Sequence, residues 1–236
     1  MLIVVWILAV LTNNKNKYFY MTEDYRINLI NNLAHDLKSP LMAMGGYAEN
    51  LKENVHTEKR EYYADAIIEN AGYMNTIISD TLELSKLDCH YISLKKEHVD
   101  LCLLSKSIMD NYSAIIEEKG INTEITGNYT IDADVKEITR ALDNLISNAV
   151  KYTKIGGIIR ICADSDGFKI ENDSSEEMPQ NVDNLWGAFV KGNESRQGRQ
   201  GSGLGLAIAK RILDMHNISS ELKYEEGKFS VSLLIR

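Results

Sequence analysis

The sequence predicts an α+β protein in two parts, a helical hairpin over residues 18–88 and a mixed α/β domain over residues 100–236. Only two prolines occur among 236 residues, where average usage of about 5% would give about a dozen, and a shortage of helix breakers favours long helices. Apolar residues step by three and four in the first part, and short apolar runs alternate with helical ones in the second. Residues 89–99 break the helical pattern and are predicted to form a linker that enters a strand.

The composition excludes several classes of function. With 44% apolar and 25% charged residues the chain is typical of a globular protein, and its net charge of −8 gives no electrostatic reason to bind nucleic acid. Its three cysteines (Cys89, Cys102 and Cys162) form no CxxC pair, and its five histidines show no HxH or HxxxH spacing. We therefore expect neither a nucleic-acid partner, nor a disulfide framework, nor a histidine metal site.

The first eleven residues are all apolar, and a cluster of Asn and Lys at 13–17 and the aromatic residues 18–20 follow. An eleven-residue helix spans about 16 Å, which is short of the hydrocarbon core of about 30 Å. A basic cluster and aromatic residues after an apolar run are typical of the cytoplasmic edge of a membrane segment. We interpret residues 1–12 as the inner end of a membrane helix or a partial anchor, with residues 1–17 as anchor remnant and flank and the rest of the chain on the cytoplasmic face. A buried amphipathic start is the alternative for this segment, and a soluble cytoplasmic protein is expected if the anchor is only a remnant.

Two apolar stripes define the predicted hairpin, one before and one after the polar segment 52–57. A single hairpin cannot bury both of its faces, so a dimeric four-helix bundle is its natural completion. Asn70 and Thr81 are polar positions on the second stripe, where they can help to fix the register. The stripes consist of Ile30, Leu33, Leu37, Leu41, Met44, Ala48 and Leu51, and of Tyr63, Ile67, Asn70, Met74, Ile77, Thr81 and Leu84.

The second part alternates predicted strands with predicted helices. Asp134 is well placed as the N-cap of the middle helix, and Glu226-Gly227 is the expected turn of the last strand pair. The predicted strands are 121–125, 157–163, 168–171, 220–224 and 229–235, and the predicted helices are 101–118, 134–152 and 204–216.

The segment His35-Asp36-Leu37-Lys38-Ser39-Pro40 carries the first functional pattern. A lone helical histidine is more often structural than catalytic, but His35 lies two positions beyond the stripe residue Leu33 and should point away from the core. An outward imidazole beside Asp36 can act as a nucleophile that the carboxylate orients. Pro40 should bend the helix there, since it removes one hydrogen bond. The segment HDLKSPL resembles the phosphoacceptor box of the two-component sensor histidine kinases.

A second pattern lies in the helix predicted over 134–152. Asn144 and Asn148 are four residues apart and share one face, with Lys151 one turn further on. Amide oxygens suit Mg²⁺, and a lysine attracts phosphate, although a plain surface pair of asparagines has the same spacing. The segment resembles the N box of the same kinases, whose ATP-binding domain is an α/β sandwich of the Bergerat type. The resemblance implies that Asn148 holds Mg²⁺, that Asn144 assists, that Lys151 contacts phosphate and that Tyr152 lines the adenine site.

The third pattern is the glycine-rich segment 191–206, which opens the last predicted helix. Closely spaced glycines let backbone amides approach phosphate oxygens, and cations concentrated in an acidic chain suit a polyanion. A flexible surface loop is the alternative, and the apolar helix that follows at once argues against it. The segment resembles the second glycine box and the ATP lid of the same kinases, which implies nucleotide contacts by Lys191, Arg196, Gly201, Gly203, Leu204 and Gly205.

Two positions depart from the family's pattern. The first glycine box normally reads DxGxG, whereas residues 170–176 contain no glycine and place Asn172 at the adenine-reading position, as some kinases of the family also do. Asp173 is the alternative by one residue. Ser39, four residues after His35, replaces the Thr or Asn that relatives with phosphatase activity often carry.

The ordered set of motifs over about residues 20–236 implies the activity of a sensor histidine kinase. ATP with Mg²⁺ would phosphorylate His35, with Asp36 beside it, and the phosphoryl group would pass to an aspartate of a response regulator; the kinase itself would be a homodimer. A catalytically weak or inactive scaffold that dimerises and binds a regulator or another kinase is the alternative, which the altered first glycine box motivates. A third hypothesis is an ATPase of the same fold without phosphotransfer.

Overall fold

A computed structural model describes residues 2–88, 93–164, 167–175, 178, 181–190 and 201–234, with side chains from residue 27 onward. The chain divides into two compact units, Met1–Asn75 and Thr76–Arg236. The boundary falls inside the second long helix, so the last part of that helix belongs to the second unit. The two units are described in turn.

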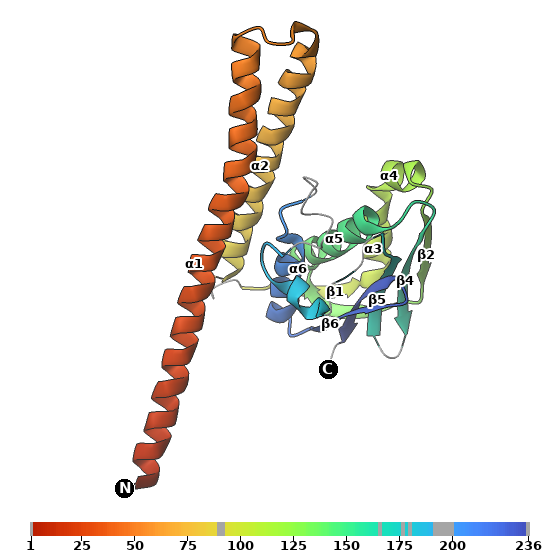
Figure 1. Ribbon diagram of the computed structural model, residues 1–236. Helices are drawn as coiled ribbons and strands as arrows, with labels where there is room; N and C mark the ends of the chain where they lie inside the picture. The colour runs from red at the N-terminus through yellow and green to blue at the C-terminus, as the bar shows by residue number, and fades with distance from the viewer. Residues whose placement is uncertain are drawn as a thin grey trace. The chain divides into compact units, whose positions relative to one another are not determined.

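The predicted helical hairpin is present (Figure 1). Helix α1 (Leu2–Lys52) continues through Pro40, a short 3₁₀ turn η1 (Thr57–Lys59) follows, and α2 (Arg60–Asp88) runs back. Asn54 and His56 adopt left-handed backbone angles in the connection, with φ of 53° and 50°. In the part of the chain that the structure describes, no helix is both long and apolar enough to cross a bilayer.

Aromatic packing holds the closed end of the hairpin together. The ring of Tyr47 on α1 stacks on Tyr63 of α2 at a centroid distance of 5.7 Å and meets Tyr62 edge-on at 6.0 Å. Other apolar side chains of the first unit stay exposed, including Leu41, which the sequence pattern placed on the buried stripe. Among the side chains of this unit that the structure describes, the exposed large apolar ones are Ile27, Ile30, Leu41, Met42, Val55, Tyr62 and Ile68.

Asn70 is a buried polar residue of the hairpin. Its side chain is fully buried, and its Nδ2 donates to the backbone oxygen of Ala66 at 2.5 Å. Its Oδ1 has no hydrogen-bond partner among the described residues. A buried polar group on an apolar stripe favours one register of helix packing over others, which agrees with the role predicted for Asn70.

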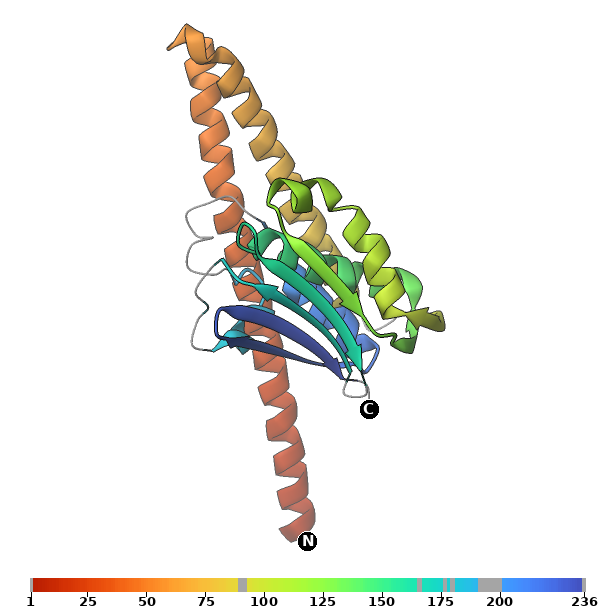
Figure 2. The same ribbon diagram turned by 90° about the vertical axis from the view of Figure 1, so that its right-hand side faces the viewer.

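The second unit contains two sheets and a layer of helices (Figure 2). A two-stranded ribbon pairs β1 (Lys96–Asp100) with β3 (Thr130–Asp134). The main sheet has the order β2-β4-β5-β7-β6, antiparallel except for the β2–β4 pair. Its strands are β2 (Asn122–Thr126), β4 (Ile158–Asp164), β5 (Gly167–Asp173), β6 (Ser219–Glu225) and β7 (Lys228–Leu234).

Helices cover one face of this sheet, as Figure 2 shows. They are α3 (Leu101–Asp110), α4 (Ser113–Glu118), α5 (Val135–Tyr152) and α6 (Gly205–Met215), with the 3₁₀ turn η2 (Val182–Trp186). The core lies between α5, α6 and the sheet, where Leu142, Ile146, Ile161, Ile208 and Leu213 have at most 1% of their surface exposed. Burying each of these side chains stabilises the fold by about 1.5–3 kcal/mol.

Asp134 caps α5 as predicted. Its carboxylate accepts hydrogen bonds from the backbone N–H groups of Lys136 and Glu137 at 3.1 and 3.3 Å. The buried His216, at the end of α6, accepts the N–H of Asp134 at its Nε2 (3.0 Å) and donates from Nδ1 to the backbone oxygen of Ile212 (2.8 Å). The start of α5 is therefore fixed to the end of α6.

The structure confirms the predicted fold class and differs from the predicted elements in β3 and in the helix predicted over 101–118. Residues 96–99 of the predicted linker form most of β1, which is the strand that the linker was expected to enter, whereas β3 was not predicted. The helix predicted over 101–118 is interrupted at Asn111–Tyr112 and forms α3 and α4. The turn at Glu226-Gly227 has positive φ at both residues, 51° and 77°, as a type I′ hairpin turn requires.

Candidate active site

His35 projects from α1 into solvent, as its position relative to the stripe predicts. Its side chain is 85% exposed, whereas the side chain of Asp36 is 19% exposed. The Nδ1 atom of His35 lies 3.3 Å from Oδ1 of Asp36. An Nδ1–H that faces a carboxylate leaves Nε2 with a free lone pair, which is the arrangement of a nucleophilic imidazole.

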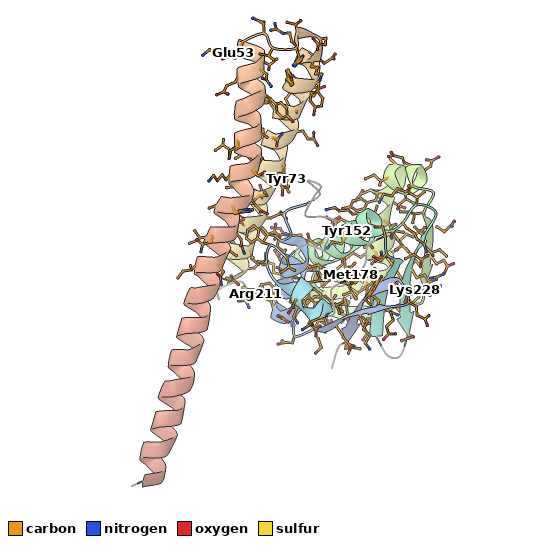
Figure 3. The ribbon with its side chains drawn as sticks, in the orientation of Figure 1. Glu53, Tyr73, Tyr152, Met178, Arg211 and Lys228 are labelled. Carbon is orange, nitrogen blue, oxygen red and sulfur yellow. The ribbon has the colours of Figure 1, made fainter. Side chains whose placement is uncertain are left out.

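The second unit contains a cavity of about 290 Å³ that most of the predicted nucleotide residues line. Figure 3 labels two of its lining residues, Tyr152 at the end of α5 and Met178. The cavity brings together three segments that are far apart in the sequence. The predicted residues that line it are Asn144, Asn148, Lys151, Tyr152, Asn172, Gly201, Gly203 and Gly205.

Helix α5 supplies one wall of this cavity. The Nδ2 of Asn144 donates to the backbone oxygen of Arg140 at 3.0 Å, which fixes the amide and leaves Oδ1 toward the glycine segment. The Nζ of Lys151 lies 4.8 Å from the centre of the Tyr152 ring, within the range of a cation–π contact. Spacing along one helix face therefore places amide oxygens and a cation on the same wall.

The glycine segment approaches that wall so closely that side chains do not fit. A Cβ at Gly201 would lie 2.6 Å from Nζ of Lys151, and φ of Gly201 is +96°. A Cβ at Gly205 would lie 2.9 Å from Oδ1 of Asn144. Backbone amides that come this near a cation and the amide side chain of Asn144 can form a cradle for phosphate oxygens.

Leu204 does not line the cavity, although the resemblance assigned it a nucleotide contact. Its side chain is fully buried, and its N–H donates to Oγ of Ser202 at 3.2 Å. Ser202 in turn donates to a carboxylate oxygen of Asp80, near the end of α2 in the same unit, at 2.6 Å. Burial raises the pKa of Asp80 above its ordinary value.

Asn172 lies at the back of the cavity, on β5. Its side chain is 3% exposed, and its Nδ2 has no hydrogen-bond partner among the described residues. A buried donor without a partner costs about 1–3 kcal/mol. The neighbouring Asp173 does not line the cavity, because its Oδ2 faces the N–H of Ile158 at 3.3 Å. The structure therefore favours Asn172 over Asp173 at this position.

Two contacts position α5 from outside the cavity. The Nζ of Lys119 donates to the backbone oxygens of Val150 and Lys151 at 3.0 and 2.6 Å, and burial lowers the pKa of this amine. The hydroxyl of Tyr112 donates to Asp143 at 2.9 Å, and burial together with this contact raises the pKa of Tyr112 to about 12. Neither residue was predicted, because each acts across more than 30 residues of sequence.

Several residues that do line the cavity were not predicted from the sequence either. Ser147 could have been predicted from the sequence, since it lies between the two asparagines, three residues after Asn144 on the same helix. Met178, Leu206 and Phe229 are apolar residues without a local signal of function. Two predicted residues, Lys191 and Arg196, lie outside the described residues. Among the residues described, no group of three or more His, Cys, Asp or Glu side chains could hold a metal ion.

Two protein families match the chain in the order of its two parts. Residues 25–90 match the family described as His Kinase A (phospho-acceptor) domain. Residues 133–235 match the family described as Histidine kinase-, DNA gyrase B-, and HSP90-like ATPase. The first range contains His35, and the second contains every predicted residue of the cavity.

Relatives match both parts together. Sensor protein SrrB of Staphylococcus aureus (strain N315) is 28% identical over 226 residues, which cover 91% of this chain and 38% of that protein. The chain thus spans well under half the length of the curated relatives that it matches.

Solved structures of histidine kinases share the fold. Histidine kinase AdeS of Acinetobacter baumannii superposes with a TM-score of 0.68 at 18% identity, covering 85% of this chain and 96% of that one. Histidine kinase ThkA, solved in complex with response regulator protein TrrA, has a TM-score of 0.66 at 19% identity and covers 85% of this chain and 59% of that one.

Proposed function

Because the chain belongs to the two-component sensor histidine kinases, we propose that it transfers the γ-phosphoryl group of ATP to His35 and then to an aspartate of a response regulator. One observation carries the proposal. The cavity of the second unit assembles the Asn144–Tyr152 face and the glycine segment, while an outward His35 is held beside Asp36 in the first unit. The proposal takes this cavity as the site of the nucleotide and His35 as the nucleophile.

In the phosphorylation step, Nε2 of His35 attacks the γ-phosphorus. A nitrogen–phosphorus bond forms, and the bond from phosphorus to the bridging oxygen of ADP breaks. The imidazole becomes positively charged, and Asp36 stabilises that charge through the Nδ1–H, at a distance of 3.3 Å. The phosphoryl group then passes from Nε2 to a carboxylate oxygen of the regulator, which restores the neutral imidazole.

The cavity residues divide the binding of ATP between them. Asn148, with help from Asn144, is the proposed holder of Mg²⁺, and Lys151 and the amides of the glycine segment bind phosphates. Mg²⁺ in such sites keeps several waters and takes one or two protein oxygens, which fits a wall that carries two amides. When bound, it neutralises charge that develops on the phosphate oxygens. Tyr152 and Asn172 receive the base, and Lys191 and Arg196 are proposed phosphate contacts.

The partners are a response regulator and a second copy of the chain. ThkA was solved with a response regulator, and its fold is that of this chain. The exposed apolar residues of the hairpin, such as Ile30 and Ile68, give a second hairpin a surface to cover, as in a dimeric four-helix bundle. Residues 1–12 are the proposed contact with the cell membrane. Co-sedimentation with lipid vesicles tests this contact, and equal sedimentation of a chain that lacks residues 1–12 contradicts it.

The decisive experiment incubates the chain with Mg²⁺ and ATP labelled in the γ-phosphate. We expect the wild type to become labelled and His35→Ala to remain unlabelled, because the nucleophile is absent. His56→Ala is the matched control, since His56 is also exposed and its Nδ1 lies 3.3 Å from a carboxylate oxygen of Glu58. Equal labelling of wild type and His35→Ala would exclude His35. An unlabelled wild type that still binds a regulator would favour the scaffold.

A further inference from the structure

Asn172 ends an alternating row of core side chains on β5. Phe168 and Ile170 precede it at steps of two on the same buried face of the strand. Its neighbours across the sheet are Ile159 on β4 and Phe229 on β7. The row thus changes from apolar to amide at the position where the strand lines the cavity.

The amide nitrogen of Asn172 lacks a hydrogen bond that a ligand in the cavity could supply. It is buried and has no hydrogen-bond partner among the described residues, although buried donors in folded proteins are nearly always paired. Since no described group holds Nδ2, the amide is able to turn about its terminal bond. An acceptor on a molecule in the cavity would complete the hydrogen bonding of Asn172.

The carboxylates beside Asn172 in the sequence are engaged elsewhere. Glu171 contacts Lys169 at 2.7 Å and Lys228 at 3.9 Å, and Asp173 faces the N–H of Ile158. Neither residue lines the cavity. The donor and the acceptor of a neutral amide therefore determine which base is accepted at this point of the wall.

An amide and a carboxylate read a purine differently. The edge of adenine presents N6–H donors beside the acceptor N1, whereas a 6-oxopurine presents the acceptor O6 beside an N1–H donor. A carboxylate only accepts hydrogen bonds, so it pairs with the N6–H of adenine or the N1–H of a 6-oxopurine, but it donates to neither N1 nor O6. An amide has one donor side and one acceptor side, and a half-turn exchanges them.

We propose that Asn172 makes this cavity a general purine site, which accepts 6-oxopurine nucleoside triphosphates as well as ATP. With adenine, Oδ1 accepts from N6–H and Nδ2 donates to N1. With hypoxanthine or guanine the amide is turned, so that Nδ2 donates to O6 and Oδ1 accepts from N1–H. The inference rests on the proposed function, since it requires the base of a nucleoside triphosphate to lie in the cavity.

The test compares ATP with inosine triphosphate, whose hypoxanthine base differs from adenine at the edge that Asn172 would read. Displacement of a fluorescent ATP analogue from the full 236-residue chain, with Mg²⁺ present, gives both dissociation constants. We expect the two constants of the wild type to agree within about tenfold. Asn172→Leu, which removes the donor and the acceptor together, should weaken both nucleotides by about ten- to a hundredfold, because both hydrogen bonds to the base are lost. Asp173→Asn, next in the strand and outside the cavity, should leave both constants unchanged.

The outcomes separate this inference from the function on which it rests. A wild type that binds ATP and rejects inosine triphosphate by more than about a hundredfold overturns the inference and leaves the kinase assignment intact. A wild type that binds neither nucleotide overturns both. Circular dichroism checks the fold of each variant, and the wild-type ratio decides by itself where Asn172→Leu does not fold. Labelling of His35 from γ-labelled inosine triphosphate is the second expected readout.

Discussion

The hairpin and the α/β unit differ in how much of their apolar surface each buries without a partner. In the α/β unit, α5 and α6 close over the sheet, and side chains such as Leu142 and Ile208 are almost completely inaccessible. In the hairpin, Leu41 and Ile68 remain more than half exposed. The α/β unit, which includes the end of α2 from Thr76 on, thus forms its core and its cavity by itself, whereas the rest of the hairpin presents its nucleophile on a surface that still needs covering. Chemistry that depends on the cavity should therefore be separable from assembly that depends on the hairpin.

Asn148→Ala gives the largest expected effect, and the effect is confined to the α/β unit. Loss of a proposed Mg²⁺ ligand removes several kcal/mol of charge stabilisation, so labelling of His35 should fall by about a hundredfold or more. The dimer should persist, because the hairpin is untouched. Rates of labelling and light scattering measure the two quantities. Lys136→Ala, an exposed change in the first turn of the same helix, is the control. A variant with normal labelling would remove Asn148 from the site.

Ile68→Glu, in the hairpin, should weaken the dimer and leave the nucleotide site unchanged. Ile68 is 70% exposed, and covering such a side chain with a second hairpin is worth about 1.5–3 kcal/mol. A charge there should weaken the dimer by about ten- to a hundredfold, while nucleotide affinity stays unchanged. Sedimentation at several concentrations measures the dimer. Glu69→Gln, at the exposed neighbouring position, is the control. An unchanged dimer would place the interface on another face of the hairpin.

Features that depend on local spacing were predicted from the sequence, and features that depend on contacts between distant segments were missed. The N-cap at Asp134, the shared face of Asn144 and Asn148 and the outward position of His35 follow from local spacing, and the structure agrees with each. Strand β3 and its pairing with β1 were missed, because both strands are short and largely polar and they pair across 30 or more residues. Met178 and Phe229 were missed for a related reason, since an apolar residue becomes part of a site only when distant segments meet.

Replacing glycine by alanine should be favourable in the hairpin, where it raises stability, and unfavourable in the α/β unit, where it weakens ATP binding. Gly72 lies in α2 with open space around its Cβ position, and alanine should raise the free energy of unfolding by about 0.5–1 kcal/mol through helix propensity. At Gly205 the added Cβ would meet Asn144, so alanine should weaken ATP binding by about tenfold, as overpacking of 1–3 kcal/mol implies. Denaturant titration and nucleotide displacement measure the two effects. Unchanged ATP affinity in Gly205→Ala would mean that Asn144 moves aside without cost.

An expected effect of similarly small size concerns Asp134, whose charge stabilises the α/β unit alone. Hydrogen bonds from backbone N–H groups, that of Lys95 above all, hold the pKa of Asp134 below its ordinary value of 3.8. A lowered pKa means that the stabilisation is complete above that value and is lost as the pH falls through the lower folded value.

Asp134→Ala should therefore cost about 1 kcal/mol at neutral pH, whereas Asp134→Asn keeps the cap and removes its titration. Denaturant titrations from about pH 7 to about pH 3, followed by the fluorescence of Trp186 in a Trp6→Phe background, should show a shallower loss of stability in Asp134→Asn than in the wild type. The exposed hairpin carboxylate Glu61, changed to Gln, is the control outside this unit. Parallel acid profiles for wild type and Asp134→Asn would show that the cap acts through its hydrogen bonds and not through its charge.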